Sequence, residues 1–138
     1  MTESTPNPPN PPAAPPLDAL IATYWKALDT RDWGLLDTTL ADDVVHDLPQ
    51  TRERIRGKQA CSRFHRDHPG ARQTRVLRTV VESPQAATWT HTTSGLTELH
   101  AQTFFTTDPH TGLITEITEF WPEPYEPPAG RDHLVERY

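Results

Sequence analysis

The chain has 138 residues, a formal net charge of −6 and a single cysteine, Cys61. This length fits one domain with one hydrophobic core. The negative charge argues against a nucleic-acid-binding surface, which needs a clustered basic face. No apolar run approaches the roughly 20 residues that span a bilayer, and we expect no secretory signal because the first residues lack a basic start and an apolar segment. Since a lone cysteine forms no intramolecular disulfide, we expect a cytoplasmic protein.

Proline is the commonest residue of the segment 1–16, MTESTPNPPNPPAAPP. Proline neither continues a helix nor donates a hydrogen bond to a sheet, and this segment offers little to bury. We therefore expect a disordered, proline-rich arm over 1–16 and a single folded domain over 17–138. The alternative, a ligand for a proline-binding module, lacks a basic anchor beside the prolines.

The stretch 17–49 predicts two helices and a strand. Apolar side chains recur at helical spacing over 17–28, which predicts an amphipathic helix. Asp32 can cap a second helix, which we expect Asp42 and the following aspartate to end. Residues 44–48 then alternate as a strand, and Pro49 stops it.

The rest of the chain predicts one more helix and a run of strands. A polar loop is expected over 50–56, followed by a helix from Gly57 whose apolar face includes Cys61, which we therefore interpret as a core residue. Short turns, which favour antiparallel neighbours, separate four predicted strands: 74–82, 86–94, 96–107 and 113–121. Helices first and strands afterwards predict an α+β fold with helices on one face of a sheet.

The order of elements from Leu17 to Trp121 resembles the nuclear transport factor 2-like superfamily, which includes SnoaL-type polyketide cyclases and ketosteroid isomerases. The resemblance implies a cone: three N-terminal helices packed on a curved, mainly antiparallel sheet, with a pocket between them. Phe104, Ile114 and Phe120 are expected on the sheet face away from the helices. Such an apolar face predicts a homodimer that pairs through it. An extended tail after Trp121 should dock on its own sheet or on a partner.

Comparison with the isomerases of that superfamily argues against their own mechanism. Tyr24 falls on the isomerases' hydrogen-bonding tyrosine, and Pro49 falls on the proline after their catalytic base. The base itself falls on Leu48, which cannot move a proton, and a second acidic residue falls near Thr103. Since that chemistry needs both carboxyl groups, we do not expect steroid isomerisation by that route.

Strand alternation predicts which side chains face the pocket. Trp89 is the largest apolar residue of its strand, so its face, shared with His91, should be concave. For the last strand alternation does not decide, but its resemblance to the final hairpin of the isomerases implies that Glu119 points inward between Ile117 and Trp121. The predicted cavity lining is Tyr24, Trp33, His46, Leu48, Phe64, Trp89, His91, Glu119 and Trp121. Within it, Glu119 and His46 can form an acid–base pair. The alternative is a structural role, in which both residues are hydrogen-bonded parts of the core.

Three functions stay open from the sequence. The first is a SnoaL-like protein that binds a small organic ligand in an apolar cavity, as a cyclase or isomerase that uses general acid–base catalysis and no cofactor. The second is a non-catalytic ligand-binding or assembly protein of the same fold, and the third is a hydrolase or isomerase using the His46–Glu119 pair. His65 and His68 share a helical face, but two ligands are too few for zinc, so no metal is expected. Neither a nucleic acid nor a membrane is an expected partner.

Overall fold

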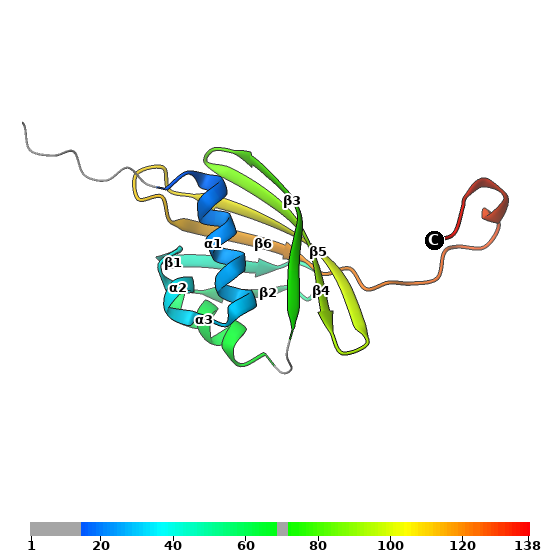
Figure 1. Ribbon diagram of the computed structural model, residues 1–138, viewed down its shortest axis with the longest axis horizontal. Coiled ribbons are helices and arrows are strands. Elements are labelled where there is room, and N and C mark those ends of the chain that lie inside the picture. Colours follow the sequence, from blue (N-terminus) through cyan, green and yellow to red (C-terminus); the bar gives the residue numbers. More distant parts are fainter. Residues whose placement is uncertain (1–14, 69–71) are drawn as a thin grey trace, which may run out of the picture.

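The computed structural model describes residues 15–68 and 72–138, and it shows helices packed on one face of a curved sheet (Figure 1). The sheet has six strands in the order β2-β1-β6-β5-β4-β3. Its neighbouring strands pair antiparallel, except for β1 and β6, which run parallel. This is the predicted α+β arrangement, a cone with three helices on one side.

The helices are α1 (Leu17–Thr30), α2 (Trp33–Asp37) and α3 (Lys58–Arg66). Arg31 closes α1 in the left-handed conformation, with φ of 57°, and its amide donates to the carbonyls of Ala27 and Leu28. The carboxylate of Asp32 accepts from the Leu35 amide at 3.0 Å, which confirms the predicted cap of α2.

The second helix is shorter than the sequence suggested. It ends at Asp37, where the hydroxyls of Thr38 and Thr39 donate to carbonyls of the preceding turn. β1 (Leu40–Leu48) follows at once, so Asp42 lies within a strand rather than at a helix end. The register of β1 against β6 shifts between Leu40 and Val45, which indicates a bulge at this point.

The segment expected to be a polar loop contains a strand, β2 (Glu53–Arg56). It pairs with β1 at the edge of the sheet, where the guanidinium of Arg54 donates to the carboxylate of Asp47 at 2.7 and 3.0 Å. Charged side chains suit a solvent-exposed edge strand, and they hide the apolar alternation by which strands are recognised.

The remaining strands follow the predicted order. They are β3 (Gln73–Glu82), β4 (Gln85–Ser94), β5 (Thr97–Thr107) and β6 (Ile114–Phe120). Pairing of His91 with His100 and of Thr103 with Glu119 fixes the register across β4, β5 and β6.

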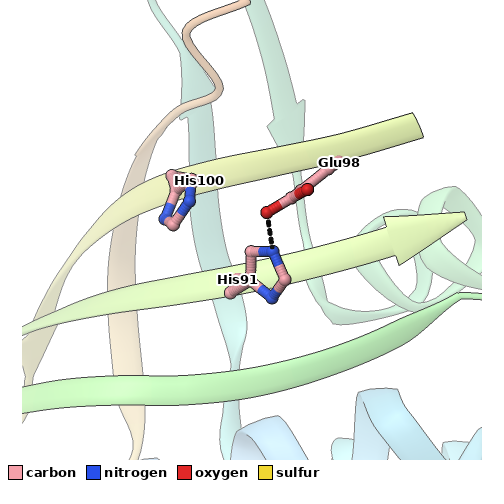
Figure 2. A group of neighbouring side chains, drawn as sticks. All are labelled: His91, Glu98 and His100. Carbon is pink, nitrogen blue, oxygen red and sulfur yellow. Dashed lines mark hydrogen bonds and ion pairs between the residues drawn. The ribbon is translucent and has the colours of Figure 1, made fainter. Parts of the chain in front are cut away.

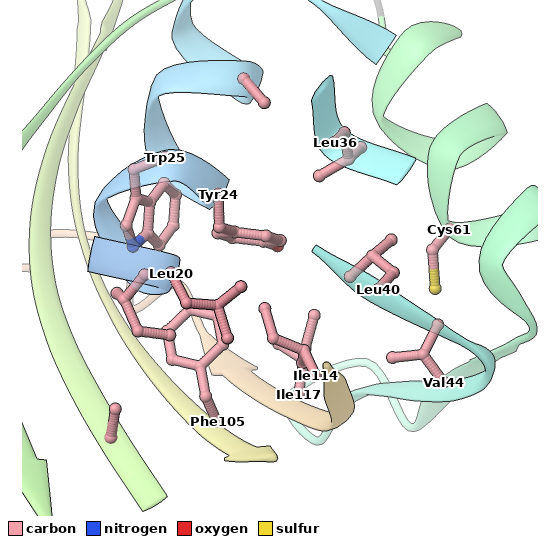
Figure 3. Packing of buried hydrophobic residues seen from close by; sticks show 13 residues of the cluster. Leu20, Tyr24, Trp25, Leu36, Leu40, Val44, Cys61, Phe105, Ile114 and Ile117 are labelled. Atoms are coloured by element: carbon pink, nitrogen blue, oxygen red, sulfur yellow. The ribbon is translucent and has the colours of Figure 1, made fainter. Parts of the chain in front are cut away.

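The core lies between α1 and the strands β1, β5 and β6 (Figure 3). The ring of Tyr24 packs edge-on against Trp25 and Phe105, with ring centroids 5.1 Å apart in both pairs. Cys61 is buried in this core as expected, and burial raises the pKa of its thiol to about 11. At neutral pH the thiol is therefore protonated and a poor nucleophile.

The predicted orientation of β4 is wrong. Thr88 and Thr90 face the helices, and the indole N–H of Trp25 donates to the Thr88 hydroxyl at 3.2 Å. Trp89 therefore lies on the opposite face with 40% of its surface exposed, and His91 shares that face. Threonine fits both the buried and the exposed face of a strand, so the position of Trp89 did not predict which face of β4 is buried.

Ile114 also departs from expectation, because it is fully buried in the core instead of lying on the outer face. A register shift between β5 and β6 at Thr106 and Thr107 brings Ile114 to the same side as Ile117. Phe104 and Phe120 remain on the outer face, with ring centroids 6.2 Å apart.

The chain after Trp121 leaves the body of the molecule as an extended tail (Figure 1). It contains one short 3₁₀ turn, Asp132–Leu134, and its large side chains Tyr125, Leu134 and Tyr138 are exposed. The tail therefore does not dock on its own sheet. Residues 1–14 of the predicted arm lie outside the described residues. Within the described parts of the chain, no helix has the length and apolar character needed to cross a membrane.

Candidate functional site

Glu119, near the end of β6, is a carboxylate buried inside the cone, with 3% of its surface exposed. Its expected inward orientation is confirmed. The hydroxyl of Thr103, its partner across β5 and β6, donates to Oε2 at 2.6 Å. This charge-assisted bond fixes the carboxylate plane and leaves Oε1 without a hydrogen-bond partner among the described residues.

His46 faces Glu119 from β1, which pairs with β6 at Ile117. Its Nε2 atom lies 3.5 Å from Oε1 of Glu119, close enough for electrostatic attraction but long for a hydrogen bond. The ring of His46 is completely buried, and neither nitrogen has a hydrogen-bond partner within the described chain. The pair therefore has unused hydrogen-bonding capacity inside the cone.

The electrostatics of the site favour an ionised Glu119. Burial alone would raise the pKa of this carboxyl group, but the neighbouring His46, the Thr103 hydroxyl and His65 together outweigh burial and lower its pKa below the usual value. At neutral pH the group is a carboxylate, which accepts protons rather than donating them.

Tyr24 and His65 complete the buried polar cluster. Burial, reinforced by the charge of Glu119, raises the pKa of Tyr24 well above its ordinary value, so its hydroxyl, which has no hydrogen-bond partner among the described residues, stays protonated. Burial lowers the pKa of His65 to about 4, so that ring is neutral at pH 7. The ring of His65 lies 5.7 Å from that of His46 and 6.5 Å from that of Tyr24, measured between centroids.

Three adjoining hollows open around Trp121. One of about 60 Å³ reaches Glu119 and Thr90. One of about 510 Å³ lies on the side of Leu48 and Phe64 and also reaches Glu119, and one of about 220 Å³ extends along β4 and β5. Phe64 stacks on Trp121 with ring centroids 6.4 Å apart, so an aromatic wall borders the carboxylate.

Cationic side chains lie on the rim of the smallest hollow. The guanidinium of Arg72 lies 5.9 Å from the ring centroid of Trp121, and that of Arg31 lies 5.1 Å from that of Trp33. Arg31 also donates to the carbonyl of Arg66 at the end of α3, which ties α1 to α3 at this rim.

The structure brings most of the predicted site residues together. Trp33, Leu48, Phe64, Glu119 and Trp121 line the hollows, whereas Tyr24 and His46 lie behind them in the buried cluster. Trp89 and His91 lie on the opposite face of the sheet, which excludes them from this cavity.

Several residues of the cavity were not predicted from the sequence, among them Arg31, His65 and Arg72. A signal existed for His65, because it follows the buried Cys61 by four residues and so lies on the same face of α3. Arg31 follows the last residue of α1, and Arg72 directly precedes β3. At such positions no periodic pattern predicts which way a side chain points.

A cone of helices on a curved, six-stranded sheet with a buried carboxylate defines the class of fold, and comparison with known proteins gives the family. The model of the SnoaL-like domain matches residues 21–117, so the chain belongs to the SnoaL-like family. A comparison with curated protein sequences gives no match.

Solved structures agree with this assignment. The chain is 41% identical to a candidate ketosteroid isomerase from Kribbella flavida, with 88% of this chain and 89% of that chain covered and a TM-score of 0.85. An NTF-2 like protein of unknown function from Burkholderia xenovorans is 21% identical, with 88% and 94% covered and a TM-score of 0.76. A candidate SnoaL-like polyketide cyclase from Shewanella denitrificans is 19% identical, with 78% and 91% covered and a TM-score of 0.68.

Proposed function

We propose that the chain binds a small organic carbonyl compound beside Glu119 and rearranges it by proton transfer, without a cofactor. One observation carries this proposal: an ionised carboxylate is buried inside the cone, fixed through one oxygen by Thr103 and, among the described residues, free of a hydrogen bond at the other. A desolvated carboxylate that reaches a hollow is a general base. The similarity to a candidate ketosteroid isomerase supports the same class of chemistry.

The proposed reaction starts at the carbon next to the substrate carbonyl. Oε1 of Glu119 takes a proton from that carbon, and the electron pair of the broken C–H bond moves into an enolate. In an isomerase, Glu119 returns the proton to another carbon of the conjugated system. In a cyclase, the enolate carbon bonds to a second carbonyl carbon, and the proton passes to the new alkoxide. The protonated Tyr24 hydroxyl and His46 are the nearby groups that can stabilise the oxyanion or relay the proton.

The second candidate is a binding protein that performs no chemistry. Leu48 favours it, because the comparison with isomerases puts Leu48 at their catalytic base, and its side chain lines the largest hollow beside Trp121. In such a protein Glu119 would serve only to hold Thr103 and orient the ligand.

Deuterium exchange separates the two candidates before the natural substrate is known. We would incubate the protein in D₂O with a panel of cyclic ketones and enones and follow loss of the α-proton signal by NMR. A general base at Glu119 predicts exchange above the solvent rate, and Glu119→Gln should abolish it while ketone binding stays within about tenfold. Bound ketones that do not exchange would support the binding protein instead.

Two further proposals concern assembly and location. We propose a homodimer that pairs through the outer face of the sheet, where Phe104 is 50% exposed beside Phe120. The exposed tail, with Tyr125 and Tyr138, would then dock on the partner.

The lone Cys61 supports a location in the cytoplasm, which is a reducing compartment.

A further inference from the structure

A second cluster of chemically active side chains lies on the outer face of the sheet, near the β4–β5 turn. His91 on β4 pairs in register with His100 on β5, and Glu98 reaches back toward them from β5 (Figure 2). The side chains of Glu98 and His91 are 63% and 20% exposed. This face is opposite to the hollows, so the cluster is separate from the site built around Glu119.

The potential ligand atoms of the three side chains converge. Nε2 of His91 lies 2.6 Å from Oε1 of Glu98, and the rings of His91 and His100 have centroids 4.9 Å apart. One ring nitrogen from each histidine and one carboxylate oxygen all lie within 4.8 Å of one another. We propose that His91, Glu98 and His100 bind one divalent transition-metal ion of the Zn²⁺ type within a single chain.

The donor set fits this chemistry. Imidazole and carboxylate are the ligands of open zinc sites, in which three protein groups leave the fourth position to water. Zinc bonds of about 2.0–2.1 Å put tetrahedral ligand atoms roughly 3.3 Å apart. The 2.6 Å contact between Nε2 of His91 and Oε1 of Glu98 must therefore open slightly, which the exposed Glu98 side chain allows by rotation. Two imidazoles and one carboxylate exclude a preference for Mg²⁺ or Ca²⁺, which take oxygen ligands.

Trp89 couples directly to this cluster. Its indole N–H donates to Nδ1 of His100 at 2.8 Å, so the neutral His100 ring carries its hydrogen on Nε2. A metal ion at Nδ1 displaces the indole, whereas a metal ion at Nε2 moves the ring hydrogen to Nδ1, which then accepts nothing. In both cases Trp89 loses its acceptor. Trp89 fluorescence therefore reports occupancy, and Zn²⁺ is a suitable probe because its filled d shell does not quench by itself.

The test is a titration of the full chain with ZnCl₂, followed by calorimetry and by tryptophan fluorescence. We expect one equivalent of Zn²⁺ per chain and a change in fluorescence. His91→Ala, His100→Ala and Glu98→Ala should each weaken binding by at least about tenfold. Trp89→Phe should keep the calorimetric binding but lose the fluorescence change, because it removes the reporter and no ligand.

His110→Ala and His133→Ala are the matched controls, since both histidines are exposed and lie outside the cluster. Their binding should equal that of the unchanged chain. Unaltered Zn²⁺ binding in His91→Ala, or no binding at submillimolar Zn²⁺, would overturn the proposal. A stoichiometry of half an equivalent of Zn²⁺ per chain would also overturn it, because the ligands of one ion would then come from two chains. Circular dichroism of each variant distinguishes a lost ligand from a lost fold.

Discussion

The two oxygens of Glu119 have different surroundings, and this difference gives the site its chemical character. Oε2 accepts a hydrogen bond from the Thr103 hydroxyl, whereas Oε1 faces the His46 ring across 3.5 Å and has no hydrogen bond to any part of the chain that the structure describes. A buried polar atom without a partner is uncommon in a folded protein and is concentrated where a ligand binds. Oε1 is therefore the atom that we expect to meet a substrate.

Thr103→Val should destabilise the fold, because valine keeps the shape of threonine and removes the donor to a buried carboxylate. A hydrogen bond to a charged group contributes about 2 kcal/mol, and the free energy of unfolding should fall by this amount in urea denaturation. Thr118→Val is the control, since Thr118 adjoins Glu119 on the other side of β6. Equal losses in the two variants would show that the Thr103–Glu119 bond contributes nothing specific.

His65 should make the protein less stable in mild acid. Its pKa is about 4 in the fold and about 6.5 in the unfolded chain, so the unfolded state binds more protons between these values. Titration of His65 therefore leaves the free energy of unfolding unchanged above the higher pKa and lowers it as the pH falls toward the lower one. From pH 7 to pH 5 the loss is about 2 kcal/mol. Urea denaturation at both pH values should show this extra loss of unfolding free energy in the unchanged chain and not in His65→Gln. An equal loss in the two proteins would contradict the prediction.

At the scale of elements, patterns with one clear period were predictable and mixed patterns were not. α1 has a single apolar stripe and was predicted from it, whereas both faces of β6 carry an aromatic residue and a glutamate, so the inward position of Glu119 came from the resemblance to the isomerases. β4 alternates threonine with residues of all sizes, so either face fits the core. Contacts far along the chain decide it: Trp25 needs the Thr88 hydroxyl, and Trp89 finds His100 outside.

Local irregularities limited the prediction further. Bulges in β1 and near the start of β6 change which side a residue faces, and Ile114 entered the core for this reason. The edge strand β2 carries charges where a buried strand would carry apolar residues. The cavity rim combines Arg31 and Arg72, which are 41 positions apart in the chain, and only the packing of α1 against β3 brings them together.

The orientation of β4 predicts that substitution of two tryptophans destabilises the fold to different extents. Trp25→Ala should cost about 3–5 kcal/mol of unfolding free energy, because it empties a buried volume and leaves Thr88 without its donor. Trp89→Ala should cost about 1 kcal/mol or less, because much of that side chain is already exposed. Guanidinium denaturation measures both, and a larger loss for Trp89 would mean that β4 is turned the other way.

At the scale of the molecule, the two faces of the sheet serve different purposes. Helices cover the inner face and enclose the carboxylate, the aromatic wall and the hollows. The outer face carries Phe104, Phe120 and Trp89 in contact with solvent or half-buried. An apolar face of this kind on a small protein marks a surface for association.

Phe104→Glu should therefore convert a dimer into a monomer. A charge at the centre of an apolar interface remains unpaired and desolvated, which opposes association by several kcal/mol. Light scattering at micromolar protein should give twice the chain mass for the unchanged protein and the chain mass for the variant. Glu116→Gln, an exposed position on β6, should leave the mass unchanged. A monomeric unchanged protein would refute the homodimer.

The most direct test of the account is the ionisation of Glu119 in the intact protein, followed by NMR of the carboxyl carbon as the pH is changed. We predict a carboxylate at neutral pH with a pKa below that of an ordinary glutamic acid, because His46, Thr103 and His65 outweigh the burial that would raise it. Glu119→Gln assigns the resonance. A carboxyl group still protonated at neutral pH would contradict the account, since Glu119 could then not act as the base on which the proposed function rests.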